Sequence, residues 1–288
     1  MTAFASEFTC AGHWTLAAQM AGLNPVWHRS PFPTAEKSLR RNWPRLPLGY
    51  DHGVRPKIMA GSPPCVGFTR ANPNRHAQTE DRQHVLTYAQ KVIEFKPEAS
   101  IMEMCTGWRD FPERDQYHAL FKKGGWRTAE LTLDAWDFGG TQKRARAFVI
   151  ASRSKDPADF QPTARKGADP VQVIRGVKDP GRYWVPDDVT KGPFGLALKW
   201  RDRRIKNEKP CYVITQSALK TIFHPTAKRS LGVNELAAIM GFPPHSESPV
   251  PPRTYWLPQN TMAMHLIGPG VDIRSAANLL RDVKEWIR

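Results

Sequence analysis

The first half of the chain alternates between short apolar runs and segments with helical spacing. Residues 8–12 end in a glycine turn, and apolar positions 16, 17, 20 and 21 predict a helix directly after it. Further strands are expected at 26–27, 57–60, 100–105, 128–134 and 147–150, and further helices at 82–95 and 112–123. Because strand and helix take turns up to about residue 152, the sequence predicts an α/β fold with a mostly parallel sheet.

The pattern changes after residue 152. Residues 153–225 contain many prolines and glycines and little helical periodicity, so we expect a small irregular domain or a long insertion. A single strand is expected within it, at 211–214. Helical spacing returns at 234–240 and 275–287. The expected parts of the chain are therefore 1–152, 153–225 and 226–288.

A second irregular stretch lies at 29–56, where prolines and arginines predict an exposed basic loop. Three aromatic residues, Trp27, Phe32 and Trp43, are interleaved with its charges. Such rings suit stacking on nucleic acid, and they equally suit packing within the loop.

The charge balance adds a partner to this picture. The 288 residues include 42 Lys and Arg against 27 Asp and Glu, which gives a net charge of +15. An excess of that size favours a polyanionic partner; nucleic acid is the first expectation and a membrane surface the alternative. No apolar run approaches 18 residues and the amino terminus does not resemble a signal, so we expect a soluble intracellular protein.

The number and spacing of the cysteines indicate which kinds of cysteine site the chain can contain. The four cysteines, at 10, 65, 105 and 211, have neither CxxC spacing nor disulfide density, which argues against structural zinc and a secreted framework. Cys65 lies within Gly61–Thr69, just past an expected strand end and bracketed by prolines and a glycine. Such a loop is rigid and sharply turned, so the sulfur can face a cleft; a buried apolar thiol is the alternative.

Two further segments carry candidate chemistry. Glu103 stands inside a short apolar strand, where a carboxylate is costly unless it is paired, hydrogen-bonded or functional; an exposed strand end is the alternative. Alternation places Gln142, Arg144 and Arg146 on one side of the chain. Two guanidinium groups pointing one way suit a phosphate or a base carbonyl, and a solvated edge is the alternative.

Taken in order, these segments resemble the motifs of the cytosine-C5 DNA methyltransferases. The Pro64-Cys65 loop resembles the nucleophile motif, residues 101–104 resemble the Glu-Asn-Val strand, and 142–146 resemble Gln-x-Arg-x-Arg. The closing helix and the last motif of the family are matched by residues 231–243 and 267–271. The resemblance implies a Rossmann-like methyltransferase fold with a target-recognition-like insertion at 153–225.

The resemblance also implies a mechanism. Cys65 would attack C6 of a flipped-out cytosine and form a transient covalent adduct. Glu103 would hydrogen-bond the N3 side and the amino group of the ring, and Arg146 would hold the O2 carbonyl. Arg144 would anchor a phosphate or the active-site loop, and residues 66–81 are placed to form the inserting loop.

The cofactor that the resemblance implies is S-adenosylmethionine. Its expected contacts are Phe8, Ala11, Gly12, Trp27, Asp51 and Pro64. The chain departs from the family here: Gly12 is followed by His13-Trp14 and the second and third glycines of the family's Gly-x-Gly-Gly motif are missing. The segment 28–30 also holds no carboxylate for the ribose. Two asparagines of other family motifs are replaced by Met104 and Pro269.

Three hypotheses follow. The first is an S-adenosylmethionine-dependent DNA cytosine-5 methyltransferase with a remodelled cofactor pocket. The second keeps attack on cytosine C6 but uses another donor or a free nucleotide, and the third is a degenerate homologue that binds DNA without turnover. Under the first we expect double-stranded DNA as partner, no membrane contact, a monomer, and the cytoplasm of a bacterium or, for a phage-encoded protein, of its host.

Overall fold

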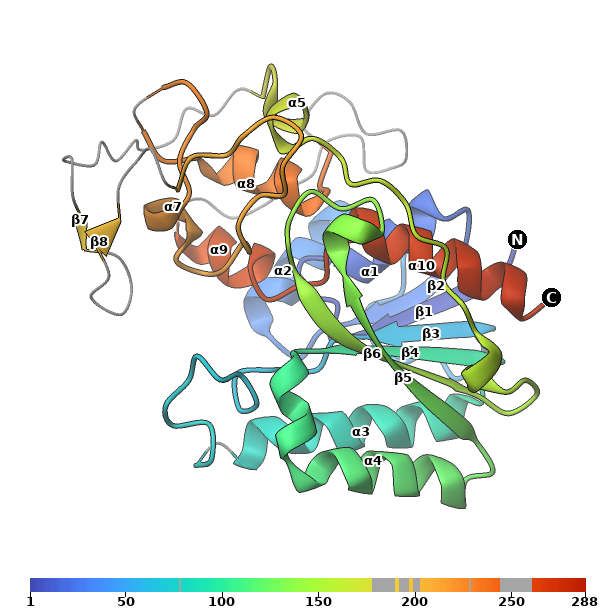
Figure 1. Cartoon of the computed structure of the whole chain (residues 1–288). Helices are drawn as coiled ribbons and strands as arrows, with labels where there is room; N and C mark the ends of the chain where they lie inside the picture. The colour runs from blue at the N-terminus through green and yellow to red at the C-terminus, as the bar shows by residue number, and fades with distance from the viewer. Residues whose placement is uncertain (78, 178–189, 192–196, 199–202, 228, 244–260) are drawn as a thin grey trace.

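A six-stranded sheet forms the centre of the computed structural model (Figure 1). The structure describes residues 1–77, 79–177, 190–191, 197–198, 203–227, 229–243 and 261–288. The strand order is β2-β1-β3-β4-β6-β5. The strands are β1 (Ala3–Glu7), β2 (Asn24–Arg29), β3 (Ile58–Gly61), β4 (Ala99–Met104), β5 (Arg127–Asp134) and β6 (Ala145–Ser152). The first four run parallel, and β6 is antiparallel to both β4 and β5.

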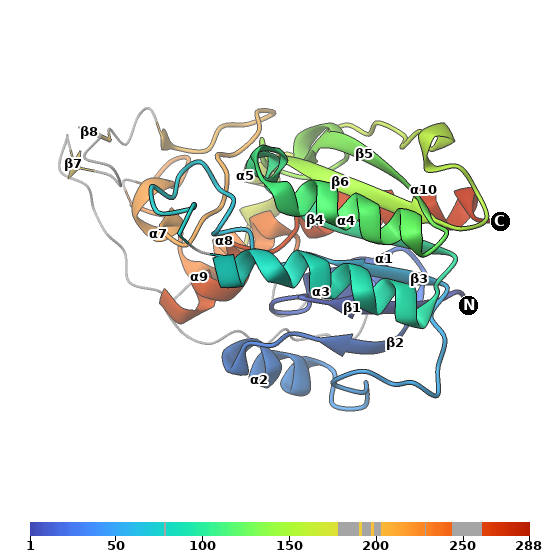
Figure 2. The same cartoon turned by 90° about the horizontal axis from the view of Figure 1, so that it is seen from below.

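Helices cover both faces of the sheet. One face carries α1 (His13–Met20) and α10 (Ile273–Trp286), and the other carries α3 (Thr79–Phe95) and α4 (Pro112–Lys123) (Figures 1 and 2). Neighbouring residues of one strand therefore point to opposite faces of the sheet and pack into two different hydrophobic cores. Phe4 packs with the α1 and α10 side and Ala5 with the α3 and α4 side, as a period of two requires.

Most expected elements of the catalytic part are present. The helices expected at 82–95, 112–123, 234–240 and 275–287 are α3, α4, α8 (Val233–Met240) and α10, with ends that differ by three residues at most. The first strand ends at Glu7, so residues 8–12 form the turn alone. The segment Ala135–Asp137, between β5 and β6, is a short 3-10 helix, η2.

The exposed loop expected at 29–56 is wrong in part, because it contains helix α2 (Pro33–Asn42). Pro33 begins the helix, and the buried residues Ala35, Ser38, Leu39 and Asn42 recur at three- and four-residue spacing. Arginines mask this stripe in the sequence because they occupy the outer face. Trp27 and Trp43 are packed inside the protein, and Phe32 is the exposed ring of the three.

Short elements gather beyond the carboxyl ends of the parallel strands (Figure 1). They are α5 (Pro170–Ile174), β7 (Thr190–Lys191), β8 (Ala197–Leu198), α7 (Ala218–Thr221), α8 and α9 (Thr261–Ile267). The strand expected at 211–214 is wrong: Cys211 makes one isolated bridge with Gln142, and the N–H of Ile214 then donates to the Gln142 side chain (3.0 Å). The Gln142 side chain thus accepts the hydrogen bond that a neighbouring strand would otherwise accept. The expected insertion also holds a cluster of basic residues at 199–206, of which 199–202 lie outside the described residues. The division at 152 and 225 stays a prediction.

Within the described residues, no helix has the length and apolar character needed to span a membrane.

Candidate active site

The end of β3 is closely packed at Gly61. A Cβ atom there would lie 2.6 Å from the ring of Tyr88 and 2.8 Å from the carbonyl oxygen of Glu7. Real Cβ contacts are never that short, so only glycine lets β3 lie against both neighbours. The loop that begins here is therefore fixed by packing at its first residue.

Three hydrogen bonds hold the loop around Cys65. The hydroxyl of Ser62 accepts from the indole N–H of Trp14 in α1 (2.9 Å). The carbonyl oxygen of Cys65 accepts from the main-chain N–H groups of Phe68 and Thr69, each at 3.0 Å. Phe68 is fully buried, so the turn that follows the cysteine is anchored in the core as well.

Cys65 lines a cavity of about 480 Å³. The walls come from residues 65–71, from the start of η1 (Thr106–Asp110), from residues 214–217, and from Gly268 and Pro269. Arg144 and Arg146 also line it. Segments that are far apart in sequence thus meet around Cys65, a partly exposed residue.

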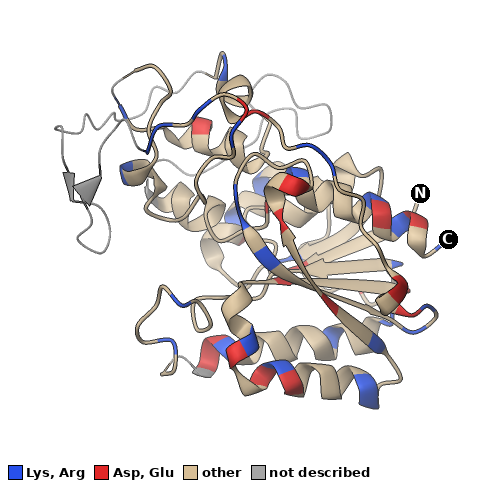
Figure 3. Ribbon diagram, in the orientation of Figure 1, with Lys and Arg blue, Asp and Glu red and all other residues tan. Residues whose placement is uncertain are grey.

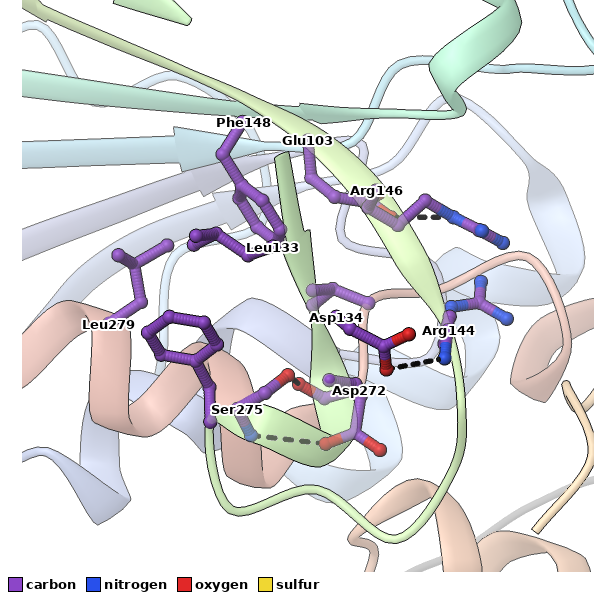
Figure 4. Close-up of a pocket in the computed structure, with 12 residues that line it drawn as sticks. Glu103, Leu133, Asp134, Arg144, Arg146, Phe148, Asp272, Ser275 and Leu279 are labelled. Atoms are coloured by element: carbon purple, nitrogen blue, oxygen red, sulfur yellow. Dashed lines mark hydrogen bonds and ion pairs between the residues drawn. The ribbon is translucent and has the colours of Figure 1, made fainter. Parts of the chain in front are cut away.

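Glu103 and Arg146 lie on neighbouring strands and form an ion pair. The Nε of Arg146 is 3.1 Å from Oε1 of Glu103 (Figure 4). The carboxylate side chain is only 4 % exposed, and its Oε1 has no hydrogen bond of good geometry among the described residues. The short distance without alignment means that the pair attracts electrostatically and leaves an acceptor free. The costly carboxylate is therefore paired, and it lies behind the arginine that lines the cavity.

Arg144 is used differently from Arg146. It is buried, and its guanidinium donates to the carbonyl oxygens of Ile214 (3.0 Å), Gly268 (3.1 Å) and Gly270 (2.8 Å). Burial lowers the pKa of Arg144 to about 10, so it remains a cation at neutral pH. These bonds tie together two walls of the cavity, and the role expected for Arg144 stays a prediction.

Cys65 differs from the other three cysteines in acidity. A hydrogen bond with the thiol of Cys105 is the largest influence on the pKa of Cys65; burial opposes it and the charge of Arg146 adds to it, with a net lowering to about 7. Burial is the main cause that raises the pKa of Cys10 and of Cys211, each to about 12. The hydrogen bond with Cys65 raises the pKa of Cys105. The thiolate, which is the nucleophilic form, is thus favoured at Cys65 alone.

The residues expected to bind the cofactor come from several segments: Phe8, Ala11 and Gly12 follow β1, Trp27 lies within β2, Asp51 lies between α2 and β3, and Pro64 follows β3. Phe8, Ala11 and Trp27 are buried in the two cores, and Pro64 is half-buried beside Cys65. Gly12 has a φ of 98°, a left-handed conformation that lets the chain turn into α1. The carboxylate of Asp51 accepts from the N–H of Gly53 (2.9 Å), so it caps a turn. Their roles stay predictions.

His13 directly follows Gly12, in the segment where the further glycines of the family motif are missing. Its ring stands edge-on to Phe242, with centroids 4.7 Å apart, and its Nε2 is 3.3 Å from the carbonyl oxygen of Ile267. A Cβ on Gly270 would lie 2.3 Å from this ring. The imidazole therefore joins α1 to the loop that precedes α10, and burial lowers its pKa to about 3, which keeps it neutral.

A buried carboxylate in β1 was not expected from the sequence. Glu7 accepts hydrogen bonds from the Tyr50 hydroxyl and from Arg29 (2.7 Å), and its Oε2 has no partner among the described residues. Burial raises the pKa of Glu7. β1 and β2 pair Glu7 with Arg29, so the carboxylate missing from β2 is present on the adjacent strand. The signal in the sequence is a Glu at the end of an apolar strand, the same signal that identified Glu103.

Comparison with known proteins supports a common family. The family model described as C-5 cytosine-specific DNA methylase matches residues 2–180. The "Putative type II methyltransferase M.MjaORF1200P" of Methanocaldococcus jannaschii is 26% identical over 207 residues, 65% of this chain and 56% of that protein. The type II methyltransferase M.SacI of Streptomyces achromogenes is 28% identical over 133 residues, 43% of this chain and 34% of that protein. The chain thus spans between a third and somewhat more than half of these relatives.

The fold has solved counterparts. The structure of the methyltransferase EhMeth of Entamoeba histolytica matches with a TM-score of 0.74 at 14% identity, over 100% of this chain and 99% of that one. At such identity the likeness concerns the fold, and the expected Rossmann-like methyltransferase fold is confirmed. Because the matching family model covers more than half of the residues, the chain belongs to the C-5 cytosine-specific DNA methylase family.

Proposed function

We propose that the protein is a DNA cytosine-5 methyltransferase that works through a transient bond between Sγ of Cys65 and C6 of a cytosine. The observation that carries the proposal is a convergence. Cys65 and Arg146 come from separate elements and line one cavity, and Glu103 is 3.1 Å from Arg146. A nucleophile, a carboxylate and a guanidinium are the three groups that attack at cytosine C6 requires.

Cys65 begins the reaction. Its pKa near 7 gives a substantial thiolate fraction at neutral pH, and this thiolate adds to C6. Glu103 holds the N3 side and the amino group of the ring and supplies a proton as negative charge develops. Arg146 donates to the O2 carbonyl. Electron density then moves to C5, which becomes the nucleophile; loss of the C5 proton later expels the Cys65 sulfur.

S-adenosylmethionine is the donor that the family implies, and when bound it supplies an electrophilic methyl group to C5. The residues at its nucleoside end fit. Glu7 offers a buried acceptor without a partner among the described residues, and Phe8 follows it directly at the end of β1. Glu7 would hold the ribose hydroxyl groups, with its carboxylate oriented by Arg29 and Tyr50. Gly12, just before α1, has no side chain and would let the protein main chain come close to the methionine part of the donor.

Double-stranded DNA is the proposed substrate, and the loop after β3 is its proposed point of entry. This loop carries basic residues (Figure 3). Arg70 and Arg75 both contact Asp110, at 3.3 and 3.4 Å, and the Arg70 side chain is 70 % exposed. The exposed guanidinium group of Arg70, which lines the same cavity as Cys65, suits the phosphates that flank a flipped base.

Two trapping duplexes separate addition from transfer. A 5-azacytosine duplex retains a covalent adduct as soon as a thiolate adds to C6. A 5-fluorocytosine duplex retains it only after a group has been transferred to C5, because fluorine does not leave as a proton. Genomic DNA carrying either base includes the target whatever its sequence.

We expect both duplexes to be trapped, the second in the presence of S-adenosylmethionine, and Cys65→Ala to abolish both adducts. Cys211→Ala, at a buried thiol outside the cavity, should leave them intact. An azacytosine adduct without a fluorocytosine adduct would overturn the proposed donor and favour another one. Absence of both adducts would overturn the enzyme and leave a DNA-binding homologue.

A further inference from the structure

A second thiol faces the same cavity as the nucleophile. Cys105 directly follows β4 and precedes η1, and it lines the cavity together with Cys65. Its residue is 9% exposed, so it is nearly enclosed by protein. Cys105 has no role in the proposed mechanism.

The two cysteines are in contact. The Sγ of Cys105 donates to the carbonyl oxygen of Cys65 (3.8 Å), and both residues line the same cavity, so the Cys105 S–H has the Cys65 sulfur as an alternative acceptor nearby. Both residues are held by their main chains: the carbonyl of Cys105 accepts from the N–H of Trp108 (3.2 Å), and that of Cys65 accepts within its own turn. A Cβ on Gly107 would lie 2.4 Å from the carbonyl oxygen of Phe68, so the absence of a side chain lets the two segments touch.

The pKa values of the two thiols shift in opposite directions. The shared hydrogen bond stabilises negative charge on Cys65, and it makes ionisation of Cys105 harder since Cys105 is the donor. The charges of Arg146 and Arg144 act in the same direction on Cys65, whereas burial and Glu103 act against them. If the Cys105 donor is removed, the arginine charges still lower the pKa of Cys65, while burial and the charge of Glu103 still raise it.

We propose that Cys105 is a positioning residue for the nucleophile: its S–H donates to the Cys65 sulfur, favours the thiolate and orients it into the cavity. The proposal rests on the role of Cys65 in the proposed function. When Cys65 bonds to C6, the Cys105 S–H retains the Cys65 carbonyl oxygen as acceptor, and the donation to sulfur returns when the product leaves. Cys105 keeps its proton throughout, and it makes no bond to the substrate.

The test is the pH dependence of alkylation of Cys65 by iodoacetamide, followed by mass spectrometry of the Cys65 peptide. The parent protein should show a midpoint near pH 7. In Cys105→Val, which has a slightly larger apolar side chain and removes the donor, the midpoint should rise toward about 8.5, and alkylation at pH 7 should fall about tenfold. Cys105→Ser, which keeps a donor, should retain most of the reactivity, and Cys211→Val serves as a control with the same chemical change.

Methyl transfer gives a second readout. Cys105→Val should be slow at pH 7 and recover near pH 9, with unchanged affinity for DNA, which a general loss of structure would not produce. If Cys105→Val titrates as the parent does, the proposal is overturned while Cys65 keeps its role. Trapping that persists in Cys65→Ala would overturn the proposed function instead.

The native chain provides a test that needs no folded variant. Diamide, which takes two hydrogens from a pair of adjacent thiols, should link Cys65 to Cys105 within one chain and block alkylation of both. A linkage that joins Cys65 to another cysteine, or no linkage at all, would contradict the contact on which the proposal depends.

Discussion

Glu103 is buried, forms an ion pair with Arg146 and keeps one oxygen without a well-aligned donor among the described residues. Glu103→Gln retains the shape of the side chain and removes both the charge and the transferable proton. We expect adduct formation with the azacytosine duplex to slow by about 10²- to 10⁴-fold, the usual contribution of a positioned acid. Affinity for DNA should stay the same. Glu285→Gln, at an exposed carboxylate in α10, is the control, and a rate within threefold of the parent would exclude Glu103 from the chemistry.

Glu7 allows the donor to be tested apart from the base. Glu7→Gln leaves an amide in place of an ionised acceptor beside Arg29, so binding of S-adenosylmethionine should weaken about tenfold or more, the value of one charge-assisted hydrogen bond. Isothermal calorimetry measures this directly. The azacytosine adduct should still form, because it needs no donor. Unchanged calorimetric affinity would place the ribose elsewhere.

At the scale of the elements, η1 packs directly against the loop after β3 at Gly107. A substitution at Gly107 therefore tests this contact. In Gly107→Ala the new Cβ would meet the carbonyl oxygen of Phe68 at 2.4 Å, so the loop must move. We expect a loss of about 1–3 kcal/mol in the free energy of unfolding, typical of overpacking, and slower alkylation of Cys65. In Gly53→Ala the nearest atom is the end of the Asp51 side chain at 3.2 Å, so this control should be nearly neutral. Equal unfolding midpoints for the two variants would show that the loop is not held by this contact.

Sequence periodicity was sufficient for elements with one clear apolar face. α4 and α10 were predicted to within two residues at each end because their buried positions recur at helical spacing. α2 was missed because prolines and arginines in its neighbourhood are typical of loops, although its narrow buried stripe was already present. The expected strand at 211–214 failed for another reason, since a side chain of a distant segment satisfies its main chain.

The same distinction applies to the site. Cys65, Glu103 and Arg146 each carry a local signal, an unusual residue at a strand end or in an alternating row, so their order along the chain was informative. Glu7 and Cys105 gain their importance from partners on other elements. The pairing of β1 with β2 sets Glu7 beside Arg29, and the loop after β3 brings Cys65 to Cys105. Such contacts depend on the folded arrangement and have no periodicity to reveal them.

At the scale of the whole molecule, the excess of 42 basic over 27 acidic residues should make DNA binding strongly dependent on salt. A surface that contacts six or more phosphates loses at least about 10³ in affinity between 50 and 200 mM salt. Cys65→Ala isolates binding from adduct formation, and fluorescence anisotropy with a labelled duplex gives the affinity at each salt concentration. A weak or absent dependence would mean that the net charge serves another partner.

The contribution of the loop to that binding is measured by one exposed arginine. Arg70→Ala, in the Cys65→Ala background, should reduce the slope of log affinity against log salt by about 1, because one phosphate contact is lost. Arg288 is the matched control: its side chain is 64 % exposed against 70 % for Arg70, and the carboxyl terminus lies at the opposite end of the sheet from the loop (Figure 1). Arg288→Ala should leave the slope unchanged. Equal slopes for the two variants would contradict entry of DNA over the loop after β3, because net charge alone does not distinguish the two ends of the molecule.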